Sequence, residues 1–349
     1  MNFAHAMAKK QSGLSLVELM IALTIGLLLL AGLTLIFVNS SEANRELQKT
    51  AQQVENGRYA INRLTEDLGN IEYWGGLTSA DIGSGGIRDY TDQTIVLASS
   101  NCGVDYSLGN ALRALGNATG STANSVFGCI DPATFRNGTD VLLVQKVISP
   151  PATPAAASPS GNPYDTDKVY LRTNTSSGFL IKAASEPLDI TSTFTIPSQS
   201  WTYWQYAPAV YYIQDTGVPS LHRLYLGSGL TMQDELLTDG VEAFHILFGI
   251  DTDGDGVANQ YKSSPTVDEL AAAINARIYV LVRSVDKDHG YTDAKTYNLG
   301  NLCYNVGGSG GCNALTDASA TPEPQKYHRR VFSSTAVLRN IAFRAVLKP

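Results

Sequence analysis

The chain contains three aspartates at alternate positions, followed directly by a glycine: Asp251, Asp253, Asp255 and Gly256. Carboxylates at positions 1, 3 and 5 of such a loop can converge on one hard cation, and a glycine at position 6 permits the sharp turn. The Val257 carbonyl and the Asn259 side chain would supply ligands at positions 7 and 9. The spacing therefore predicts a calcium site, and we expect no other cofactor.

This loop departs from a full EF-hand at position 12, where Lys262 replaces the bidentate glutamate. The departure predicts weak binding, with a dissociation constant of about 10⁻⁴–10⁻³ M. The alternative interpretation is a solvated Asp-Gly turn that follows the strand expected over residues 241–250.

Four cysteines form a second set of reactive residues: Cys102, Cys129, Cys303 and Cys312. Their number is even and no Cys-x-x-Cys spacing occurs, so disulfides are favoured over a zinc site. Sequence alone permits three pairings. The local pairing, Cys102–Cys129 and Cys303–Cys312, is favoured because each pair brackets a loop rich in glycine and asparagine. Closing each loop would contribute roughly 3 kcal/mol in the chain-entropy model.

The chain shows no pattern that predicts catalysis. Its histidines lack metal-ligand spacing, and no Gly-x-Ser-x-Gly elbow, phosphate loop or dinucleotide fingerprint occurs. His245 lies in an apolar run and is expected to pack in the core. An aromatic cluster could bind sugar, but core packing is the favoured interpretation of its residues, Trp201, Tyr203, Trp204 and Tyr206. We therefore do not expect an enzyme.

The N-terminus combines a short basic leader, a glycine and a single acidic residue in a long apolar run. Lys9 and Lys10 precede Gly13, and Glu18 follows it. Residues 19–41 carry no charge and would form roughly 35 Å of helix, enough to cross a bilayer. A lone carboxylate at depth in a membrane costs about 2.5–3.5 kcal/mol, so we expect Glu18 to have a partner. A secretory signal peptide would instead be cut after its apolar run.

The block Gly13-Leu14-Ser15-Leu16-Val17-Glu18 resembles the type IV prepilin signal, with Leu14 in place of the usual phenylalanine. The resemblance implies that a prepilin peptidase cuts after Gly13 on the cytoplasmic side and methylates the new amine of Leu14. In a filament, Glu18 would face the Leu14 amine of a neighbouring subunit and set the register of assembly. Lys9 and Lys10 would hold the leader in the cytoplasm by the positive-inside rule.

Two blocks in the C-terminal third resemble the PilW family of minor pilins. The first comprises the aspartate-rich loop and the run Ala276–Ser284, and the second is Tyr327–Asn340. The resemblance covers roughly residues 1–75 and 240–340, whereas residues 77–205 carry no motif that we recognise.

One long helix is predicted to carry the N-terminal site. Apolar residues continue beyond the membrane-length run in two seams: Leu47, Val54, Ile61 and Leu68, then Leu64 and Ile71. The helix is expected over about residues 14–70, with Gly57 as a weak point and Trp74-Gly75-Gly76 as its end. Its apolar stripe must be buried, either in a coiled coil or against a sheet from the rest of the chain.

Short β-like runs after the helix predict such a sheet. They lie at residues 94–98, 140–147, 168–172, 179–182, 209–213, 221–226, 241–250, 277–283 and 330–338. A short helix is expected over residues 266–274, and Asp215-Thr216-Gly217 predicts a hairpin. The expected fold class is α+β, a type IV pilin-like fold with a long N-terminal helix packed on an antiparallel β-sheet.

These elements divide the chain into four segments. Residues 1–13 form the leader, 14–41 the membrane-spanning or filament-core helix and 42–72 its amphipathic continuation. Residues 73–349 form a β-rich domain, with loop insertions at about 100–165. The net charge of −7 and the pI of about 5.2 give no electrostatic footprint for binding nucleic acid.

Together these features predict a minor pilin of a type IV pilus, a structural subunit that primes assembly, lies at or near the filament tip and supports twitching motility and adhesion. The resemblance implies four partners: a prepilin peptidase, other minor pilins, the major pilin and the inner membrane of a Gram-negative bacterium. The ectodomain would face the periplasm before assembly into an extracellular pilus. Two alternatives stay open, a pseudopilin of a type II secretion system and an adhesin or sugar-binding module on a pilin stalk.

Overall fold

The computed structural model describes residues 13, 15–77, 87–88, 102, 111–148, 151–152, 165, 167–173, 178–182, 202–227, 231–318 and 322–341. Contacts divide the chain into two compact units, Met1–Ala51 and Gln52–Pro349. The division between the units therefore falls inside the first helix.

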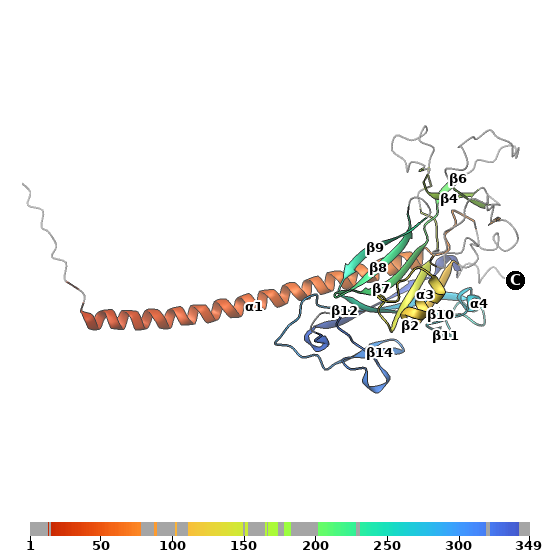
Figure 1. Ribbon diagram of the computed structural model, residues 1–349. Coiled ribbons are helices and arrows are strands. Elements are labelled where there is room, and N and C mark those ends of the chain that lie inside the picture. The colour runs from red at the N-terminus through yellow and green to blue at the C-terminus, as the bar shows by residue number, and fades with distance from the viewer. Residues whose placement is uncertain are drawn as a thin grey trace, which may run out of the picture. The chain divides into compact units, whose positions relative to one another are not determined.

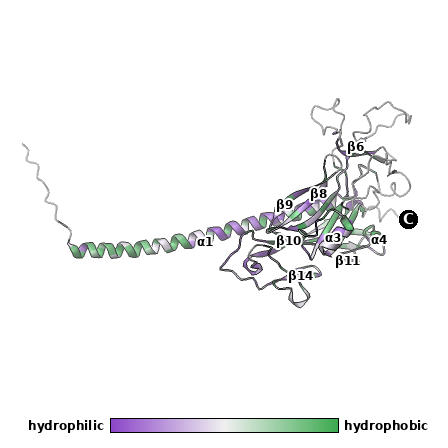
Figure 2. Cartoon of the chain, viewed as in Figure 1, coloured by the Kyte–Doolittle hydropathy of each residue, from purple (hydrophilic) through white to green (hydrophobic). Residues whose placement is uncertain are grey.

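Helix α1 runs from Leu16 to Gly69, which confirms the long helix predicted from the sequence (Figure 1). Its 54 residues extend over about 80 Å. Figure 2 shows hydrophobic residues along the first part of α1 and more hydrophilic ones toward its end. The helix stops a few residues before Trp74, because Glu72 adopts a left-handed φ of 56° and donates its backbone N–H to the Gln145 carbonyl at 3.2 Å.

Five antiparallel strands form the larger sheet, in the order β2-β3-β7-β8-β9. Their bounds are Leu112–Ala118, Thr139–Val144, Ala209–Asp215, Pro219–Leu226 and Met232–Asp239. The predicted hairpin joins β7 to β8, with Asp215 opposite Pro219. Its turn requires a glycine, because Gly217 has a φ of 124°.

A second antiparallel sheet has the order β11-β10-β12-β16. Its strands are Gln260–Lys262, Val241–Ile250, Ala273–Arg283 and Arg329–Val337, respectively. Helix α4, Val267–Leu270, is shorter than the helix predicted over residues 266–274. The prediction was too long at its C-terminal end because Ala273 already pairs with Ile250 as part of β12.

Two smaller sheets depart from the single antiparallel sheet that we expected. One has the order β1-β5-β4-β6, with strands Ile87–Arg88, Gly178–Lys182, Val169–Thr173 and Thr202–Gln205. The other comprises β13, β14 and β15, at Thr296–Leu299, Leu302–Asn305 and Asn313–Ala314. The pairs β1–β5 and β14–β15 are parallel. Short 3₁₀ helices, η3 and η4, lie at Ser309–Gly311 and Pro324–Lys326.

The region expected to be a loop insertion at about 100–165 also contains regular structure. Residues 112–118 form β2, and Gly120–Phe127 form helix α3. Helix α3 is defined by local caps: Thr119 and Thr122 form a capping box, and Gly128 ends the helix with a φ of 69°. The strand predicted at residues 94–98 lies outside the described residues.

The core of the second unit joins α1 to both large sheets. Ile61, Leu64 and Leu68 of α1 belong to one buried cluster with Tyr211 of β7 and Phe244 of β10. Every residue of β10 is buried, because this strand lies between β11 and β12 and also contacts β3, β7 and β8. From Ile61 to Ile71 the apolar stripe is therefore buried against sheets of its own chain, as predicted, whereas Leu47 at the start of the predicted stripe is 68% exposed.

Candidate functional site

Gly13 and Glu18 lie at the start of the N-terminal segment, whereas Leu14 lies outside the described residues. Gly13 is exposed, and a Cβ built on it would meet no atom within 4 Å. The packing of the chain itself therefore does not require a glycine at this position. A requirement for glycine would come from a molecule that approaches this peptide bond from outside, as a processing enzyme does.

Glu18 lies in the first turn of α1, surrounded along the helix by exposed apolar side chains that include Leu19 and Ile21. Among the described residues, none forms a hydrogen bond or an ion pair with the Glu18 carboxylate. By length and composition alone, α1 is long and apolar enough to cross a membrane. The carboxylate therefore lies on a surface that a bilayer or other apolar helices would cover.

The second part of α1 carries buried polar side chains that fix it to the sheets. Gln53 donates two hydrogen bonds from Nε2, to the Val282 carbonyl at 2.8 Å and the His328 carbonyl at 2.9 Å. Asn56 donates from Nδ2 to the Asp239 carbonyl at 2.9 Å. The sequence analysis did not single out either residue. Their helical spacing to the buried Ala60 and Leu64 is the signal that could have placed Gln53 on the inner face.

Gly57 lies at a close contact between α1 and the second sheet. A Cβ at this position would lie 2.3 Å from Cε2 of Phe332, on β16. The glycine that weakens the helix in isolation is thus required by packing, because only a hydrogen fits beneath the aromatic ring.

Asp67 is the buried carboxylate of the second half of α1, with a side chain only 1% exposed. It accepts a hydrogen bond from Lys146 Nζ at 2.6 Å and another from the Tyr211 hydroxyl, and it lies 3.4 Å from Arg63 Nη2. Burial and the charge of Asp67 raise the pKa of Tyr211 far above its ordinary value, so this hydroxyl stays protonated and donates. The network joins α1 to β7 and to the segment that follows β3.

A second buried ionic cluster involves Arg329, which lies in the block Tyr327–Asn340. Arg329, at the start of β16, donates to both carboxylate oxygens of Glu242 on β10, and its Nη1 donates to Asp293 Oδ2 at 2.8 Å. Burial alone would raise the pKa of Glu242, but the charges of Arg329 and Arg136 hold this pKa below its ordinary value. The cluster therefore ties the segment around Asp293 to the second sheet.

The three aspartates of the predicted calcium loop converge between β10 and β11. One carboxylate oxygen from each of Asp251, Asp253 and Asp255 lies within 4.8 Å of the others. The Asp251 carboxylate accepts the N–H groups of Gly254 at 2.7 Å and Gly256 at 2.8 Å. These bonds lower the pKa of Asp251, the Gly256 bond most of all, so the carboxylate is ionised as a cation ligand must be.

The other two predicted ligands are placed differently. Val257 is 61% exposed, and its N–H donates to Asp255 Oδ1 at 2.8 Å. Asn259 accepts the Thr252 N–H at 2.8 Å through Oδ1, and its Nδ2 donates to Asp253 Oδ2 at 3.2 Å. In this arrangement Asn259 holds the loop closed, and the carboxylates are the oxygens that could bind a cation.

Both disulfides join the cysteines that the local pairing favoured, Cys102 to Cys129 and Cys303 to Cys312. Their Cα–Cα distances of 4.8 and 4.7 Å lie within the usual range. The second bond closes a short loop between β14 and β15.

The remaining candidates serve packing. His245 is fully buried, with Nδ1 2.9 Å from Asp140 Oδ2 and Nε2 2.6 Å from Asn301 Oδ1. In the aromatic cluster, Tyr206 is buried and Trp204 donates from Nε1 to Thr173 Oγ1 at 3.0 Å, while Trp201 lies outside the described residues. These contacts agree with the core-packing interpretation.

Comparison with known proteins adds two family matches. Residues 8–34 match a family described as a prokaryotic N-terminal methylation motif, and residues 210–340 match one described as type IV pilus-assembly protein W. The second match includes the aspartate loop and the Glu242–Arg329 cluster. No curated protein matches the chain.

Among solved structures, the chain is similar to the type IV-like pilin TTHA1219 from Thermus thermophilus. The two share 10% sequence identity over 58% of this chain and 78% of that chain, with a TM-score of 0.27.

Proposed function

We propose that this chain, which matches the PilW family model and the N-terminal methylation motif, is a prepilin-type minor pilin that primes assembly of a type IV pilus at or near the filament tip. Its role is structural and not catalytic. The methylation motif implies processing by a prepilin peptidase and association with pilus components. Under this proposal its further partners are other minor pilins and the major pilin.

The observation that carries the proposal is the difference in burial along α1. From Leu16 to Val38 the large apolar side chains of the helix are exposed, whereas Leu64 and Leu68 are fully buried in the domain. A helix of this kind can exchange a bilayer for the helices of neighbouring subunits while the domain stays folded. We propose a single-pass position in the inner membrane of a Gram-negative bacterium, with the ectodomain in the periplasm, followed by transfer into an extracellular pilus.

Mass spectrometry of the protein extracted from membranes tests the processing step. In cells with an active prepilin peptidase, we expect an N-terminus at Leu14 that carries one methyl group. Gly13→Val should block the cut, although a Cβ at Gly13 meets nothing in the chain. Gly26→Val, also without neighbours in the chain, is the matched control and should be processed normally. An intact Met1 in the unmodified protein would contradict the proposal.

A deletion strain separates the pilus from the type II secretion system, which uses pseudopilins with the same N-terminal signal. Cells that lack the chain should lose surface pili, twitching motility and pilus-dependent adhesion, and should secrete type II substrates normally. Normal pili with impaired secretion would identify a pseudopilin instead.

We also propose that the loop from Asp251 to Asn259 binds calcium, because its three carboxylates converge and its turn is already formed. Calcium at about 100 times the dissociation constant should stabilise the full chain in detergent by roughly 2.7 kcal/mol. Asp253→Ala should remove this gain, and Asp268→Ala, a change of the same charge on α4, should keep it. Magnesium should substitute poorly because it demands a stricter octahedral geometry. If a titration to millimolar calcium gives no heat of binding and no change in melting temperature, the calcium proposal is wrong and the loop is an acidic turn.

A further inference from the structure

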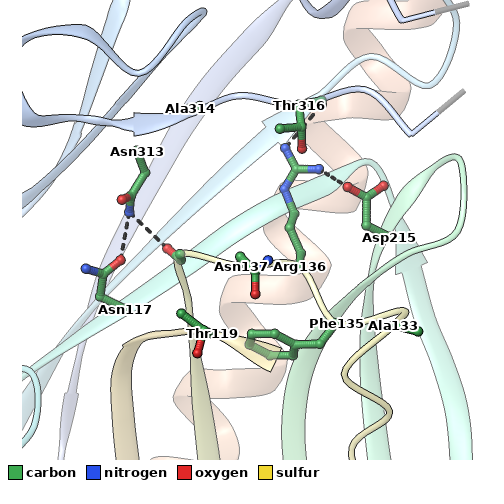
Figure 3. Close-up of a pocket in the computed structure, with 11 residues that line it drawn as sticks. Asn117, Thr119, Ala133, Phe135, Arg136, Asn137, Asp215, Asn313, Ala314 and Thr316 are labelled. Atoms are coloured by element: carbon green, nitrogen blue, oxygen red, sulfur yellow. Dashed lines mark hydrogen bonds and ion pairs between the residues drawn. The ribbon is translucent and has the colours of Figure 1, made fainter. Parts of the chain in front are cut away.

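A cavity of about 510 Å³ lies beside β2 and the end of β7, and Figure 3 shows the side chains that line it. Four separate segments of the chain line it. They contribute Asn117 and Thr119, residues 133 and 135–138, Asp215, and residues 313, 314 and 316. The volume lies within the range of about 300–1,000 Å³ that is typical of small-molecule sites.

Three asparagine side chains in the cavity are held in fixed orientations. Asn137 accepts the Gly120 N–H at 2.7 Å through Oδ1. Asn313 donates from Nδ2 to Asn117 Oδ1 at 2.9 Å and to the Gly138 carbonyl at 3.1 Å, as Figure 3 shows. Among the described residues, nothing bonds the opposite ends of these amides, which are Nδ2 of Asn117 and Asn137 and Oδ1 of Asn313. The cavity therefore presents both hydrogen-bond donors and an acceptor.

The backbone at Asn117 is held in an uncommon conformation that brings this side chain to the cavity. Asn117 has a left-handed φ of 51°, and the pairing of β2 with β3 shifts register between Leu115 and Ala118. The Asn117 N–H is fixed by Asp140 Oδ1 at 2.9 Å. Bulges of this kind redirect side chains and are frequent beside binding sites.

The charges in the cavity are already balanced by the protein. The Arg136 side chain, only 5% exposed, forms ion pairs with Asp215 and Glu242, and its Nη2 donates to the Thr316 carbonyl at 3.3 Å. Phe135 adds a buried aromatic ring to the lining. A compensated arginine offers little to an anion, whereas amides, hydroxyls and an apolar wall suit a ligand with many hydroxyl groups and no charge.

From these observations we infer that the cavity binds a neutral carbohydrate of one or two sugar units. The site is distinct from the aromatic cluster around Trp204, and it does not depend on the pilin role. Asn313, which lines the cavity, directly follows Cys312 in the chain. The Cys303–Cys312 disulfide therefore restrains the segment that carries Asn313. Host glycans and bacterial wall glycans share this chemistry, and the test below separates them.

The test uses the full chain in lauryldimethylamine oxide, a detergent without a sugar head group. Saturation-transfer NMR and calorimetry would measure binding of galactose and lactose, which represent host glycans, and of N-acetylglucosamine and diacetylchitobiose, which represent bacterial walls. Sialic acid and inorganic phosphate serve as anionic probes. We expect at least one neutral sugar to bind, and neither anion to bind more tightly than that sugar.

Two variants locate the binding. Asn137→Asp keeps the acceptor for the Gly120 N–H but replaces the Nδ2 donor by a charged oxygen, so affinity should fall roughly tenfold or more. Ala314→Trp fills the cavity from the exposed end of β15 and should have a similar effect even if Asn137→Asp disturbs α3. Asn124→Asp, the same charge change on an exposed position of α3, should bind like the unmodified chain.

Three results would overturn the inference: no neutral sugar binds, an anion binds more tightly than every neutral sugar, or both cavity variants bind the sugar normally. Processing at Gly13 and incorporation into filaments should be unchanged in both cavity variants. A failure of the pilin role would therefore appear in different measurements from a failure of the carbohydrate site.

Discussion

Each half of α1 carries a carboxylate whose charge is unfavourable in apolar surroundings. The two carboxylates differ in whether the same chain provides partners for that charge. Asp67 is buried, and Lys146, Tyr211 and Arg63 of the same chain compensate it. Glu18 lies among exposed apolar side chains, and no described residue pairs with it. The carboxylate in the second half of the helix is thus compensated within the chain, whereas we propose that the carboxylate in the first half finds its partner in another molecule.

The glycines of α1 show the same difference. A Cβ added to Gly57 would lie 2.3 Å from the Phe332 ring, whereas a Cβ added to Gly26 or to Gly32 would meet no atom within 4 Å. One half of the helix is shaped by contacts that already exist. The other half keeps an exposed apolar surface, which the proposed role in assembly requires.

Removing the compensated carboxylate should produce the largest loss of stability. Asp67→Ala leaves Lys146 and Arg63 without their buried partner, and we expect the free energy of unfolding to fall by about 3 kcal/mol. Denaturant unfolding of the full chain in detergent, followed by tryptophan fluorescence, measures the change. Glu66→Ala is the adjacent control, since Glu66 is 63% exposed, and it should change stability by less than about 1 kcal/mol. If both changes lower the free energy of unfolding equally, the buried Asp67 contributes no more to stability than the exposed Glu66.

Adding one methyl group at Gly57, where α1 approaches the second sheet closely, should have the next largest effect. Gly57→Ala forces Phe332 to move and should destabilise the domain by about 1–3 kcal/mol, despite alanine's better helix propensity. Gly32→Ala, with open space around it, should leave domain unfolding unchanged. Combining Gly57→Ala with Phe332→Val should cost less than the sum of the single changes, because the smaller side chain makes room. Strict additivity would show that the two residues do not compete for space.

Sequence reasoning succeeded where the signal is periodic or local. The apolar spacing from Val54 to Ile71 predicted the buried face of α1, and the continuous apolar run of residues 241–250 predicted β10. The aspartate loop was visible because its residues are adjacent in sequence. The caps of α3, by contrast, depend on Thr119 and Gly128 rather than on apolar periodicity, and the helix was missed.

The contacts that complete the domain could not be read from the sequence, because their partners are distant along the chain. Gln53 bonds the carbonyl of Val282, 229 positions away, and Arg329 bonds Glu242, 87 positions away. The residues around Gln53 do not indicate which carbonyl it will bond. The Val282 carbonyl lies near the end of β12 and meets Gln53 only in the folded chain. The asparagine cavity is a similar case, since four separate segments must fold before it exists.

The buried pair of His245 and Asp140, away from α1, should make stability depend on pH. Burial would lower the pKa of His245, but the hydrogen bond and charge of Asp140 raise it above the ordinary value. The pair therefore contributes its full stability below about pH 6.5, the unfolded value, and loses it as pH rises through the higher folded value. Unfolding curves across this range should be flatter for His245→Gln than for the unmodified chain. Identical slopes would show that His245 does not carry its proton in the fold.

Glu18→Ala should have the smallest effect on unfolding and a decisive effect on assembly. The change removes a charge that no described residue compensates, so the domain beyond Gln52 should unfold as before, and insertion into the membrane should be unchanged or improved. In filaments the Leu14 amine of a neighbouring subunit would lose its counter-charge, and we expect incorporation to fall sharply. Quantitative immunoblotting of sheared pili against membrane fractions measures this, with Glu42→Ala, an exposed acidic residue of the same helix, as the matched control. If Glu18→Ala subunits enter filaments normally, the Glu18 carboxylate has no partner in the filament. The lack of a partner for Glu18 within the chain would then have no role in assembly.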